Sequence, residues 1–159
     1  MMRSATTGYN VIPVNLTALN ELFGKVNGKV GYQLGAKPRA GAKPGTFKLS
    51  DCSGFVRWLL PLICTEHIDI PDGSVNQRLW CAKRGFKLTS YKTSAPLKDG
   101  RLRIAFIRPK GRKVGHVWLV LNGHTMESYG GHGIGRRLYS EGVLMRRVSD
   151  CFVLTDPLD

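Results

Sequence analysis

One short segment of the sequence, Asp-Cys-Ser-Gly at residues 51–54, combines a nucleophile with a predicted helix start. Apolar residues recur at helical spacing after it, so we expect a helix to begin within residues 51–53, with Asp51 or Ser53 as its cap. Free backbone N–H groups and the helix dipole at such a position favour a thiolate over a thiol. The same N–H groups could receive the oxyanion of an acyl-transfer intermediate, with Gly54 keeping bulk away from it. Cys52 is therefore a candidate nucleophile, although an isolated cysteine there is more often an unreactive core residue.

A candidate general base lies further along the chain. His116 stands at the start of an apolar strand, after a basic turn at residues 110–114. Most histidines beside a strand have structural roles, but a Cys–His dyad needs an imidazole in such a place to accept or share the thiol proton. The next strand carries Glu127, which could hold the far ring nitrogen of His116 and fix its tautomer. That is the role of the third member of a catalytic triad.

Two other histidines compete with Glu127 for this third position. His124 is expected on the opposite face of its strand from Glu127, because successive strand residues alternate between the two faces. His132 lies in a Gly-rich loop, where it could reach substrate or simply be exposed. We favour Glu127, and the sequence leaves His124 and His132 open as alternatives.

The elements that must position these residues follow from hydrophobic periodicity. Residues 16–26 form one predicted helix, with Asn15 or Thr17 as its cap, and residues 74–84 form another, closed by Gly85. Pro61 is expected to end or kink the helix that begins near Cys52. Five later segments have strand character, and an Asn-Gly hairpin signal separates two of them: residues 101–108, 117–121, 125–129, 143–148 and 151–155.

Helices therefore precede strands, which predicts an α+β fold in which N-terminal helices pack on a central antiparallel β-sheet. The chain has 159 residues and no break in composition. This length suits a single domain over residues 1–159, in which residues 1–30 would form an N-terminal helical extension.

The charge of the chain limits its partners. Lys and Arg number 24 against 11 Asp and Glu, a formal charge of +13, which implies a polyanionic partner or surface. Nucleic acid, anionic lipid and the bacterial cell wall all fit. A nucleic-acid-binding module is disfavoured, because no aromatic recognition motif accompanies the basic clusters. These clusters are Lys37, Arg39, Lys43 and Lys48, and Arg136, Arg137, Arg146 and Arg147.

Neither a membrane span nor a secretory signal is expected, because no apolar run is long enough and the first residues lack an apolar core with a cleavage site. Cys64, Cys81 and Cys151 are interpreted as free thiols, since a domain of this size needs no disulfides, although the sequence does not decide their pairing. Cys64 and His67 have no second close pair to complete a zinc site. We therefore expect no metal and no cofactor.

The ordered set of motifs resembles the NlpC-type family of papain-like peptidoglycan peptidases, over about residues 31 to 129. Secreted bacterial amidase effectors with a papain-like core share part of the set. The matching pieces are Gly-Tyr before a Gly-rich loop, Asp-Cys-Ser-Gly-Phe-Val, Ser-Val-Asn-Gln, and Gly-His-Val followed by a polar residue on the next strand, at residues 31–32, 51–56, 74–77, 115–117 and 127.

This resemblance implies a papain-like core with Cys52 as nucleophile and His116 as general base. Glu127 departs from the family pattern, which usually has histidine at the third position. Tyr32 would lie near the thiol and orient substrate, unless it is only a core or rim tyrosine. Ser53 and His132 are the further substrate-binding residues that we expect.

The implied activity is a hydrolase reaction on the bacterial cell wall. By the resemblance, a cysteine endopeptidase would cut an amide bond of peptidoglycan stem peptides, at the γ-D-glutamyl bond to the diamino acid. An N-acetylmuramoyl-L-alanine amidase on the same core is the alternative. The expected partners are peptidoglycan and, because no signal peptide is seen, a secretion-system or phage-tail carrier with a cognate immunity protein. The site of action would be the periplasm or the cell exterior.

Overall fold

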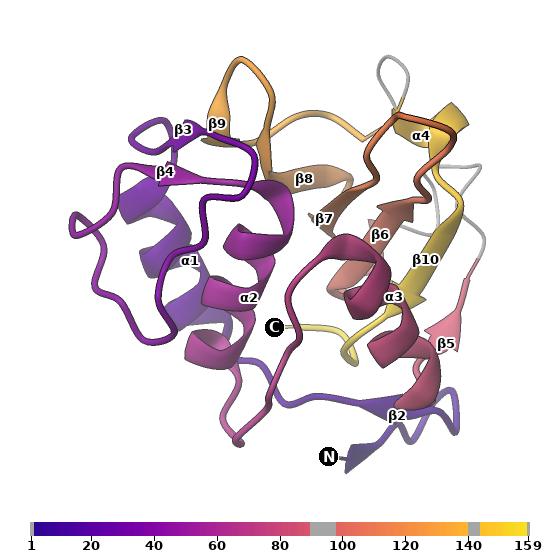
Figure 1. Ribbon diagram of the computed structural model, residues 1–159. Coiled ribbons are helices and arrows are strands. Elements are labelled where there is room, and N and C mark those ends of the chain that lie inside the picture. The colour runs from indigo at the N-terminus through magenta and orange to yellow at the C-terminus, as the bar shows by residue number, and fades with distance from the viewer. Residues whose placement is uncertain (1, 90–97, 140–143, 159) are drawn as a thin grey trace.

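A six-stranded antiparallel sheet forms the centre of the protein, with the strand order β5-β10-β6-β7-β8-β9 (Figure 1). The computed structural model describes residues 2–89, 98–139 and 144–158. The strands of this sheet are β5 (Lys87–Leu88), β6 (Arg103–Ile107), β7 (His116–Leu121), β8 (His124–Tyr129), β9 (Gly133–Gly135) and β10 (Asp150–Val153). The helices are α1 (Leu16–Val26), α2 (Cys52–Ile63), α3 (Ser74–Lys83) and α4 (Leu144–Arg147).

Two short strand pairs lie outside the central sheet. Strand β1 (Met2–Arg3) pairs antiparallel with β2 (Asn10–Val11), and β3 (Gly31–Tyr32) pairs parallel with β4 (Leu49–Ser50). Strand β4 leads directly into α2, at the top of Figure 1. The α+β class and the antiparallel sheet predicted from the sequence are confirmed.

Helix α2 is the central helix of the molecule, because it is apolar on nearly all sides. Its buried residues include Phe55, which packs edge-on against Phe23 of α1, and Trp58, which packs against Phe47 of the preceding loop and donates to the carbonyl of Ala42. Truncating an aromatic side chain in such a position to alanine costs about 3–5 kcal/mol of stability. Helix α1 packs beside α2 through Leu19, Phe23 and Val26, as its apolar stripe predicts. The cap of α1 is Asn15, whose Oδ1 accepts the N–H of Ala18 at 2.9 Å.

The opposite face of the sheet carries a second, smaller core. Trp118 and Val120 of β7 pack there with Ala105 and Cys151 of the neighbouring strands. Tyr139, which follows β9, is fully buried in the same cluster. Because alternate residues of β7 point to opposite faces, Val117 and Leu119 contribute to the main core under α2 instead.

Several local predictions are confirmed. The helix over residues 16–26 has those bounds, and α3 ends at Lys83 with Gly85 at a positive φ of 75°. The hairpin turn between β7 and β8 has positive φ at both Asn122 and Gly123, as the Asn-Gly signal predicts.

Two element boundaries differ from the predictions. Of the end or kink predicted at Pro61, the end is wrong: the helix that begins at Cys52 continues to Ile63, because the proline lies in the last turn and the N–H of Cys64 still reaches the carbonyl of Leu60 at 3.0 Å. The strand predicted over residues 143–148 is also absent: residues 144–147 form α4, and residue 143 lies outside the described residues. The two edges of β6 are already taken by β10 and β7, so this segment has no place beside it.

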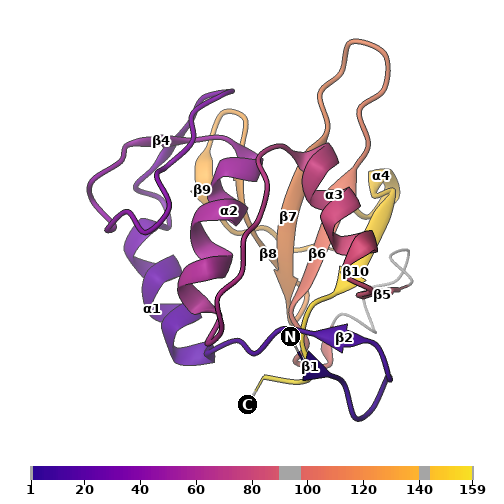
Figure 2. The same ribbon diagram turned by 60° about the horizontal axis from the view of Figure 1, so that its bottom comes forward.

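Both chain ends lie at the end of the sheet far from the start of α2 (Figure 2), where Oγ of Ser4 donates to Asp156. Residues 1–30, predicted as a helical extension, contain the β1–β2 pair as well as α1. At the opposite end, the loop between β6 and β7 projects beyond the sheet (Figure 2). Within the described ranges, no helix has both the length and the apolar character needed to cross a membrane.

Candidate active site

Cys52 is the first residue of α2 and is nearly buried, with 7 % of its surface exposed. The helix starts there because Asp51 caps it: Oδ1 of Asp51 accepts the N–H of Gly54 at 2.7 Å. The first N–H groups of a helix have no partner within it. The carboxylate of Asp51 accepts the N–H of Gly54. The N–H groups of Cys52 and Ser53 have no acceptor in the described part of the chain.

The capping carboxylate of Asp51 is itself held by the preceding loop. Its Oδ2 accepts the N–H of Gly35 at 3.1 Å and a hydrogen bond from Nζ of Lys37 at 2.7 Å. Lys37 also donates to Oγ of Ser53 at 2.6 Å. The Ser53 hydroxyl is therefore buried and engaged, and only its backbone N–H remains available to a substrate. Sequence reasoning assigned Lys37 only to a basic cluster and missed this structural role.

Gly54 has a structural role that sequence reasoning did not identify. A Cβ there would lie 2.8 Å from Oδ1 of Asp51 and 2.9 Å from the carbonyl oxygen of Ala36. The glycine therefore allows the cap and the loop to approach the helix, which the structure requires at this position. Its role in clearing space for an oxyanion stays a prediction.

His116 is the first residue of β7 and its ring reaches both Cys52 and Glu127. Its Nε2 lies 2.8 Å from Oε1 of Glu127, so Nδ1 is the ring nitrogen not used by the carboxylate, and the ring also interacts with the thiol of Cys52. The ring stacks on Trp118, with centroids 5.3 Å apart and planes 26° apart. Burial alone would lower the pKa of His116, but the hydrogen bonds to Cys52 and Glu127 outweigh it and raise the pKa to about 9. The imidazolium form is thus favoured at neutral pH.

Glu127 on β8 is fully buried and bound on two sides. Besides His116, it contacts Arg137, whose Nη2 lies 2.5 Å from Oε1 and whose Nε lies 3.1 Å from Oε2. Burial would raise the pKa of Glu127, but the hydrogen bonds from His116 and Arg137 hold it below its usual value. Sequence reasoning assigned Arg137 only to a basic cluster, because the Gly-rich segment that forms β9 shows no strand pattern and its pairing with β8 was not predicted.

The other two histidines considered for the third position lie elsewhere. His124 is exposed and lines a surface hollow with Leu16 and Asn20 of α1, away from His116. His132 is exposed in the turn between β8 and β9, where its ring packs on Tyr129 with centroids 4.7 Å apart. Among the three candidates, the structure brings Glu127 alone into contact with His116.

Long-range contacts join the start of α2, the sheet and α3 to one another. Oγ of Ser128 on β8 donates to the carbonyl of Ser50 at 2.7 Å, directly before the cap. Nε2 of Gln77 on α3 donates to the carbonyl of Ser53 at 2.9 Å. At Gly115 a Cβ would lie 2.9 Å from Oγ of Ser74, so this glycine lets the start of α3 approach the strand of His116. The Ser-x-x-Gln and Gly-His-Val motifs thus meet at the candidate site.

Tyr32, on β3, lies beside the thiol. Burial raises the pKa of its phenol, and the nearby Cys52 and Asp51 raise it further, so the phenol stays protonated. The turn of the β8–β9 hairpin packs on the residues just before Tyr32: the N–H of Ile134 donates to the carbonyl of Val30 at 2.9 Å. At Gly133 a Cβ would overlap that carbonyl, so glycine is required there.

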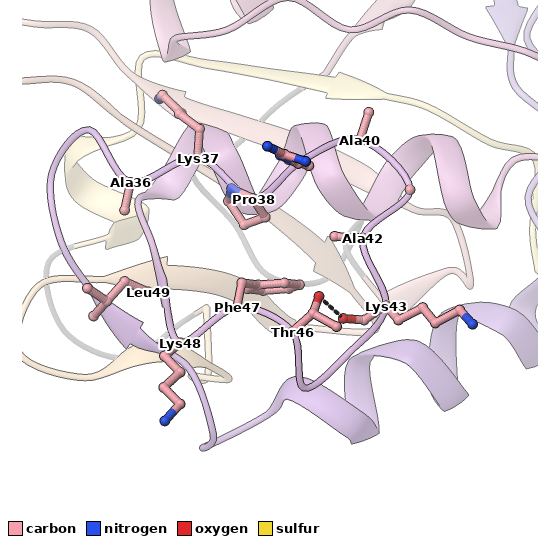
Figure 3. A pocket seen from close by; sticks show the side chains of 12 residues that line it. Ala36, Lys37, Pro38, Ala40, Ala42, Lys43, Thr46, Phe47, Lys48 and Leu49 are labelled. Atoms are coloured by element: carbon pink, nitrogen blue, oxygen red, sulfur yellow. Dashed lines mark hydrogen bonds between the residues drawn. The ribbon is translucent and has the colours of Figure 1, made fainter.

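A hollow of about 790 Å³ lies under the loop of residues 36–49, where basic and apolar side chains surround it (Figure 3). None of Cys52, His116 and Glu127 lines it. We place the candidate site at the cysteine and not in this hollow, because only the cysteine has a base and a hydrogen-bonded carboxylate beside it. Across the described residues, no group of three or more His, Cys, Asp or Glu side chains could hold a metal ion. All four cysteines are free thiols there.

The sequence matches no protein-family model and no curated protein. Solved structures do resemble it. A protein from Staphylococcus aureus subsp. aureus Mu50, described as similar to lipoprotein of the NLP/P60 family, has 15 % identity over 94 % of this chain and a TM-score of 0.59. The P60 domain of an antigen from M. avium subspecies paratuberculosis has 18 % identity over 87 % of this chain and a TM-score of 0.54.

The present chain covers 45 % of the staphylococcal chain and 92 % of the mycobacterial P60 domain. It therefore spans less than half the length of the first structure and nearly all of the second. Identities this low show the fold alone: the chain has an NlpC/P60-like, papain-like fold.

Proposed function

We propose that this protein is a cysteine peptidase or amidase that hydrolyses an amide bond in the stem peptides of bacterial peptidoglycan. One observation carries the chemistry: the Cys52 thiol, at a helix start, interacts with the imidazole of His116, which a buried carboxylate holds by a hydrogen bond. The substrate class is supported by the resemblance of the sequence motifs to peptidoglycan peptidases and by the NlpC/P60-like fold.

In the proposed reaction, the thiolate of Cys52 attacks the carbonyl carbon and forms a thiohemiacetal-like tetrahedral intermediate. The N–H groups of Cys52 and Ser53 are the donors we assign to the oxyanion. His116, as imidazolium, gives its proton to the leaving amine as the C–N bond breaks, which yields a thioester on Cys52. The neutral imidazole then takes a proton from water, whose oxygen attacks the thioester and releases the acid product and the Cys52 thiolate, which restores the starting ion pair.

The remaining residues have supporting roles in the proposal. Glu127 fixes the ring of His116 with Nδ1 toward the thiol and stabilises its positive charge. Tyr32 would hold substrate beside the nucleophile. His132, on the rim of the β8–β9 hairpin, remains a predicted substrate contact. The basic surface suits a substrate with free carboxylates.

The bond we propose is the γ-D-glutamyl bond to the diamino acid, and the alternative is the bond between N-acetylmuramic acid and L-alanine. Mass analysis of muropeptides after digestion separates the two, because each cut creates a different new amino terminus. The place of action we propose is the cell wall, reached through a secretion-system or phage-tail carrier. A cognate immunity protein would protect the producing cell.

The deciding experiment is digestion of purified Gram-negative sacculi by the wild type and by Cys52→Ala. We expect the wild type to release peptide fragments and Cys52→Ala to release none while keeping its unfolding temperature. Cys64→Ala is the matched control, because Cys64 is a half-buried thiol at the other end of α2. Undiminished release by Cys52→Ala would overturn the proposed function.

A further inference from the structure

We propose that Arg137 is a positioning residue of the active site, which keeps Glu127 ionised and aimed at His116. The inference rests on the proposed function in one respect: it takes the Cys52–His116 pair as the reacting pair. It goes further because it assigns Arg137 to the active site as a fourth residue, and Arg137 lies in a segment outside the sequence motifs. It also explains how glutamate can occupy a position where related motifs usually carry histidine.

The first support is geometric. The guanidinium of Arg137 contacts both carboxylate oxygens of Glu127, at 2.5 Å and 3.1 Å. A two-point contact of this kind fixes the plane of the carboxylate as well as its distance, which a single bond from lysine would not do. With Arg137 in place, Oε1 of Glu127 lies 2.8 Å from Nε2 of His116.

Arg137 is itself held rigidly against β8. Its backbone N–H donates to Oγ1 of Thr125 at 2.9 Å, and its carbonyl accepts the N–H of Thr125 at 2.7 Å. Its guanidinium lies over the ring of Tyr129, 4.0 Å from the centroid. Thr125, Glu127 and Tyr129 are alternate residues of one strand, so Arg137 is anchored on both sides of the carboxylate it binds.

The second support is electrostatic. Glu127 has no exposed surface, and a buried carboxylate without sufficient partners becomes protonated. Among the described residues, the charged and titratable groups near it are His116 on β7, Arg137 after β9, and Cys52 on α2 behind the imidazole; the thiol also has Tyr32 and the Asp51–Lys37 ion pair beside it. Apart from that ion pair, whose charges cancel, two anions balance two cations once the thiolate and imidazolium have formed. Without the guanidinium, the site would hold two anions and one cation, and protonation of Glu127 would remove one of them.

A protonated Glu127 would no longer stabilise the imidazolium of His116, and the thiolate would lose its counter-ion in turn. The testable consequence is the pH at which Cys52 becomes reactive. The readout we choose is the rate of alkylation of Cys52 by iodoacetamide between pH 4 and 10, followed by mass spectrometry of the peptide that carries Cys52. This rate reports the thiolate and needs no cell-wall substrate.

We expect Arg137→Ala to move the acidic limb of this profile upward by about 1 to 3 pH units, since removing an opposite charge from a carboxylate has effects of that size. Arg137→Lys should restore much of the limb, because it keeps the charge. Arg136→Ala is the matched control: its guanidinium lies over Phe23, 5.3 Å from the ring centroid, and it should leave the profile unchanged. A folded Arg137→Ala protein with the wild-type limb overturns the proposal.

A second comparison covers the case in which Arg137→Ala does not fold. Glu127→Gln removes the buried charge, so the double variant Glu127→Gln/Arg137→Ala should fold and have nearly the same acidic limb as Glu127→Gln alone. An upward shift of about 1 to 3 pH units between these two variants overturns the proposal, because Arg137 would then act without Glu127.

The two proposals fail separately. If Arg137→Ala leaves the acidic limb unshifted while the wild type digests sacculi, only the role of Arg137 is overturned. A clear shift with no digestion of sacculi overturns the substrate class and keeps the role of Arg137. A wild-type profile like that of an ordinary thiol overturns both.

Discussion

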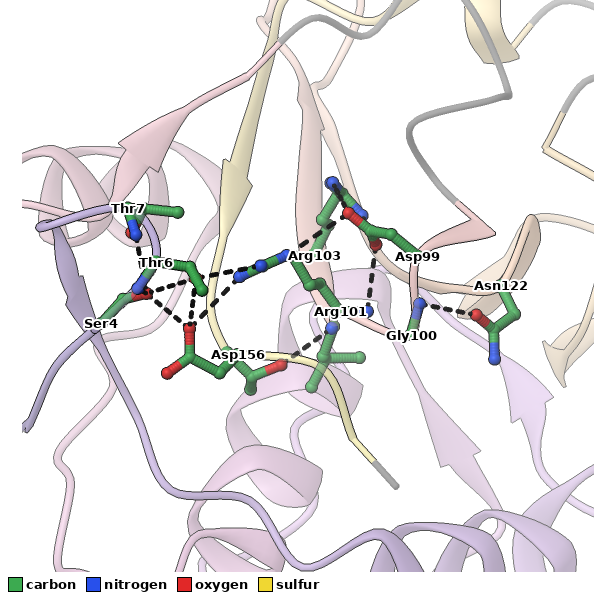
Figure 4. Close-up of polar contacts among 11 residues, drawn as sticks. Ser4, Thr6, Thr7, Asp99, Gly100, Arg101, Arg103, Asn122 and Asp156 are labelled. Atoms are coloured by element: carbon green, nitrogen blue, oxygen red, sulfur yellow. Dashed lines mark hydrogen bonds and ion pairs between the residues drawn. The ribbon is translucent and has the colours of Figure 1, made fainter.

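Two arginine–carboxylate pairs, each joined by two hydrogen bonds, lie toward opposite ends of the sheet and differ in which partner is buried. A further pair of this kind, Arg108 with Asp150, has an exposed guanidinium and is left out of the comparison. At the candidate site, Arg137 binds Glu127. At the far end, Arg103 binds Asp99 with bonds of 2.7 and 2.8 Å (Figure 4). The burial is reversed between them. The side chain of Glu127 is 0 % exposed and that of Arg137 34 %, whereas Arg103 is 4 % exposed and Asp99 37 %.

Because the burial is reversed, the Arg137–Glu127 pair can serve chemistry, whereas the Arg103–Asp99 pair is structural. The buried carboxylate of Glu127 accepts hydrogen bonds, and besides Arg137 it still accepts one from the imidazole of His116. A buried guanidinium only donates and stays protonated in any folded protein, so the far cluster has no comparable use. That cluster connects elements instead: Arg101 binds Asp156, and Asp156 accepts the hydroxyl of Ser4 at 2.5 Å, which joins the two chain ends (Figure 4).

The largest difference between the clusters should appear in catalysis. Glu127→Gln is expected to lower the rate of peptide release by roughly 10²- to 10⁴-fold, because a neutral amide neither stabilises the imidazolium nor fixes its tautomer as a carboxylate does. Asp99→Asn, the equivalent change at the far cluster, should leave the rate within twofold. Steady-state digestion of sacculi measures both, and comparable losses in the two variants would contradict the division of roles.

The next effect concerns stability at the far cluster. Asp99→Ala leaves the buried charge of Arg103 without its carboxylate partner and should lower the free energy of unfolding by about 3 kcal/mol. Arg103→Met leaves a carboxylate that water can reach, so its loss should be about 1 kcal/mol or less. Urea denaturation gives both values. The opposite ranking would mean that the exposed partner, Asp99, sets the energetics of the pair.

The β8–β9 hairpin offers a test of how the site cluster is assembled. Gly131 and Gly133 both have positive φ, 81° and 78°, but only at Gly133 would a Cβ meet the backbone near Val30. Gly131→Ala should cost about 1 kcal/mol of stability for the left-handed conformation, and Gly133→Ala about 2–3 kcal/mol with a loss of activity. Equal unfolding free energies for the two variants would show that the hairpin adjusts without strain.

The smallest expected effect is the change in rate and stability per pH unit. The pKa of His116 is raised from its ordinary 6.5 to about 9 in the folded protein. Its stabilising contribution is therefore complete below pH 6.5 and is lost as pH rises through 9, where the rate should begin to fall tenfold per pH unit. At the far cluster, burial opposes but Arg103 and Arg101 hold the pKa of Asp99 below its ordinary 3.8. That contribution is lost only as pH falls below 3.8, so rate and stability profiles should separate the clusters.

Local patterns gave the elements that depend on short stretches of chain. Helix α1, the start of α2 at Cys52 and the turn at Asn122 were all predictable, because caps, periodicity and turn residues act within a few positions. The strand predicted over residues 143–148 was wrong for the opposite reason. Apolar content alone suggested it, and whether a strand forms depends on a free edge elsewhere in the sheet.

The candidate site divides in the same way. Cys52 and His116 stand out because each lies at the start of an element beside a recognisable motif, and Glu127 follows from the hairpin between β7 and β8. Arg137 carried no such signal. It reaches Glu127 only because β9 pairs with β8 in the register that sets Glu127 opposite Gly135.

The sequence by itself determined the nucleophile candidate, its candidate base and the α+β class. The two residues follow from local motifs and their spacing, and the class follows from the order of helices and strands. Tertiary structure decided which polar group meets His116, that Lys37 supports the cap, and that Glu127 is a buried anion with its own guanidinium. The physical reason is that a charge takes its role from its burial and its neighbours. Those neighbours come from strands whose pairing no local pattern specifies.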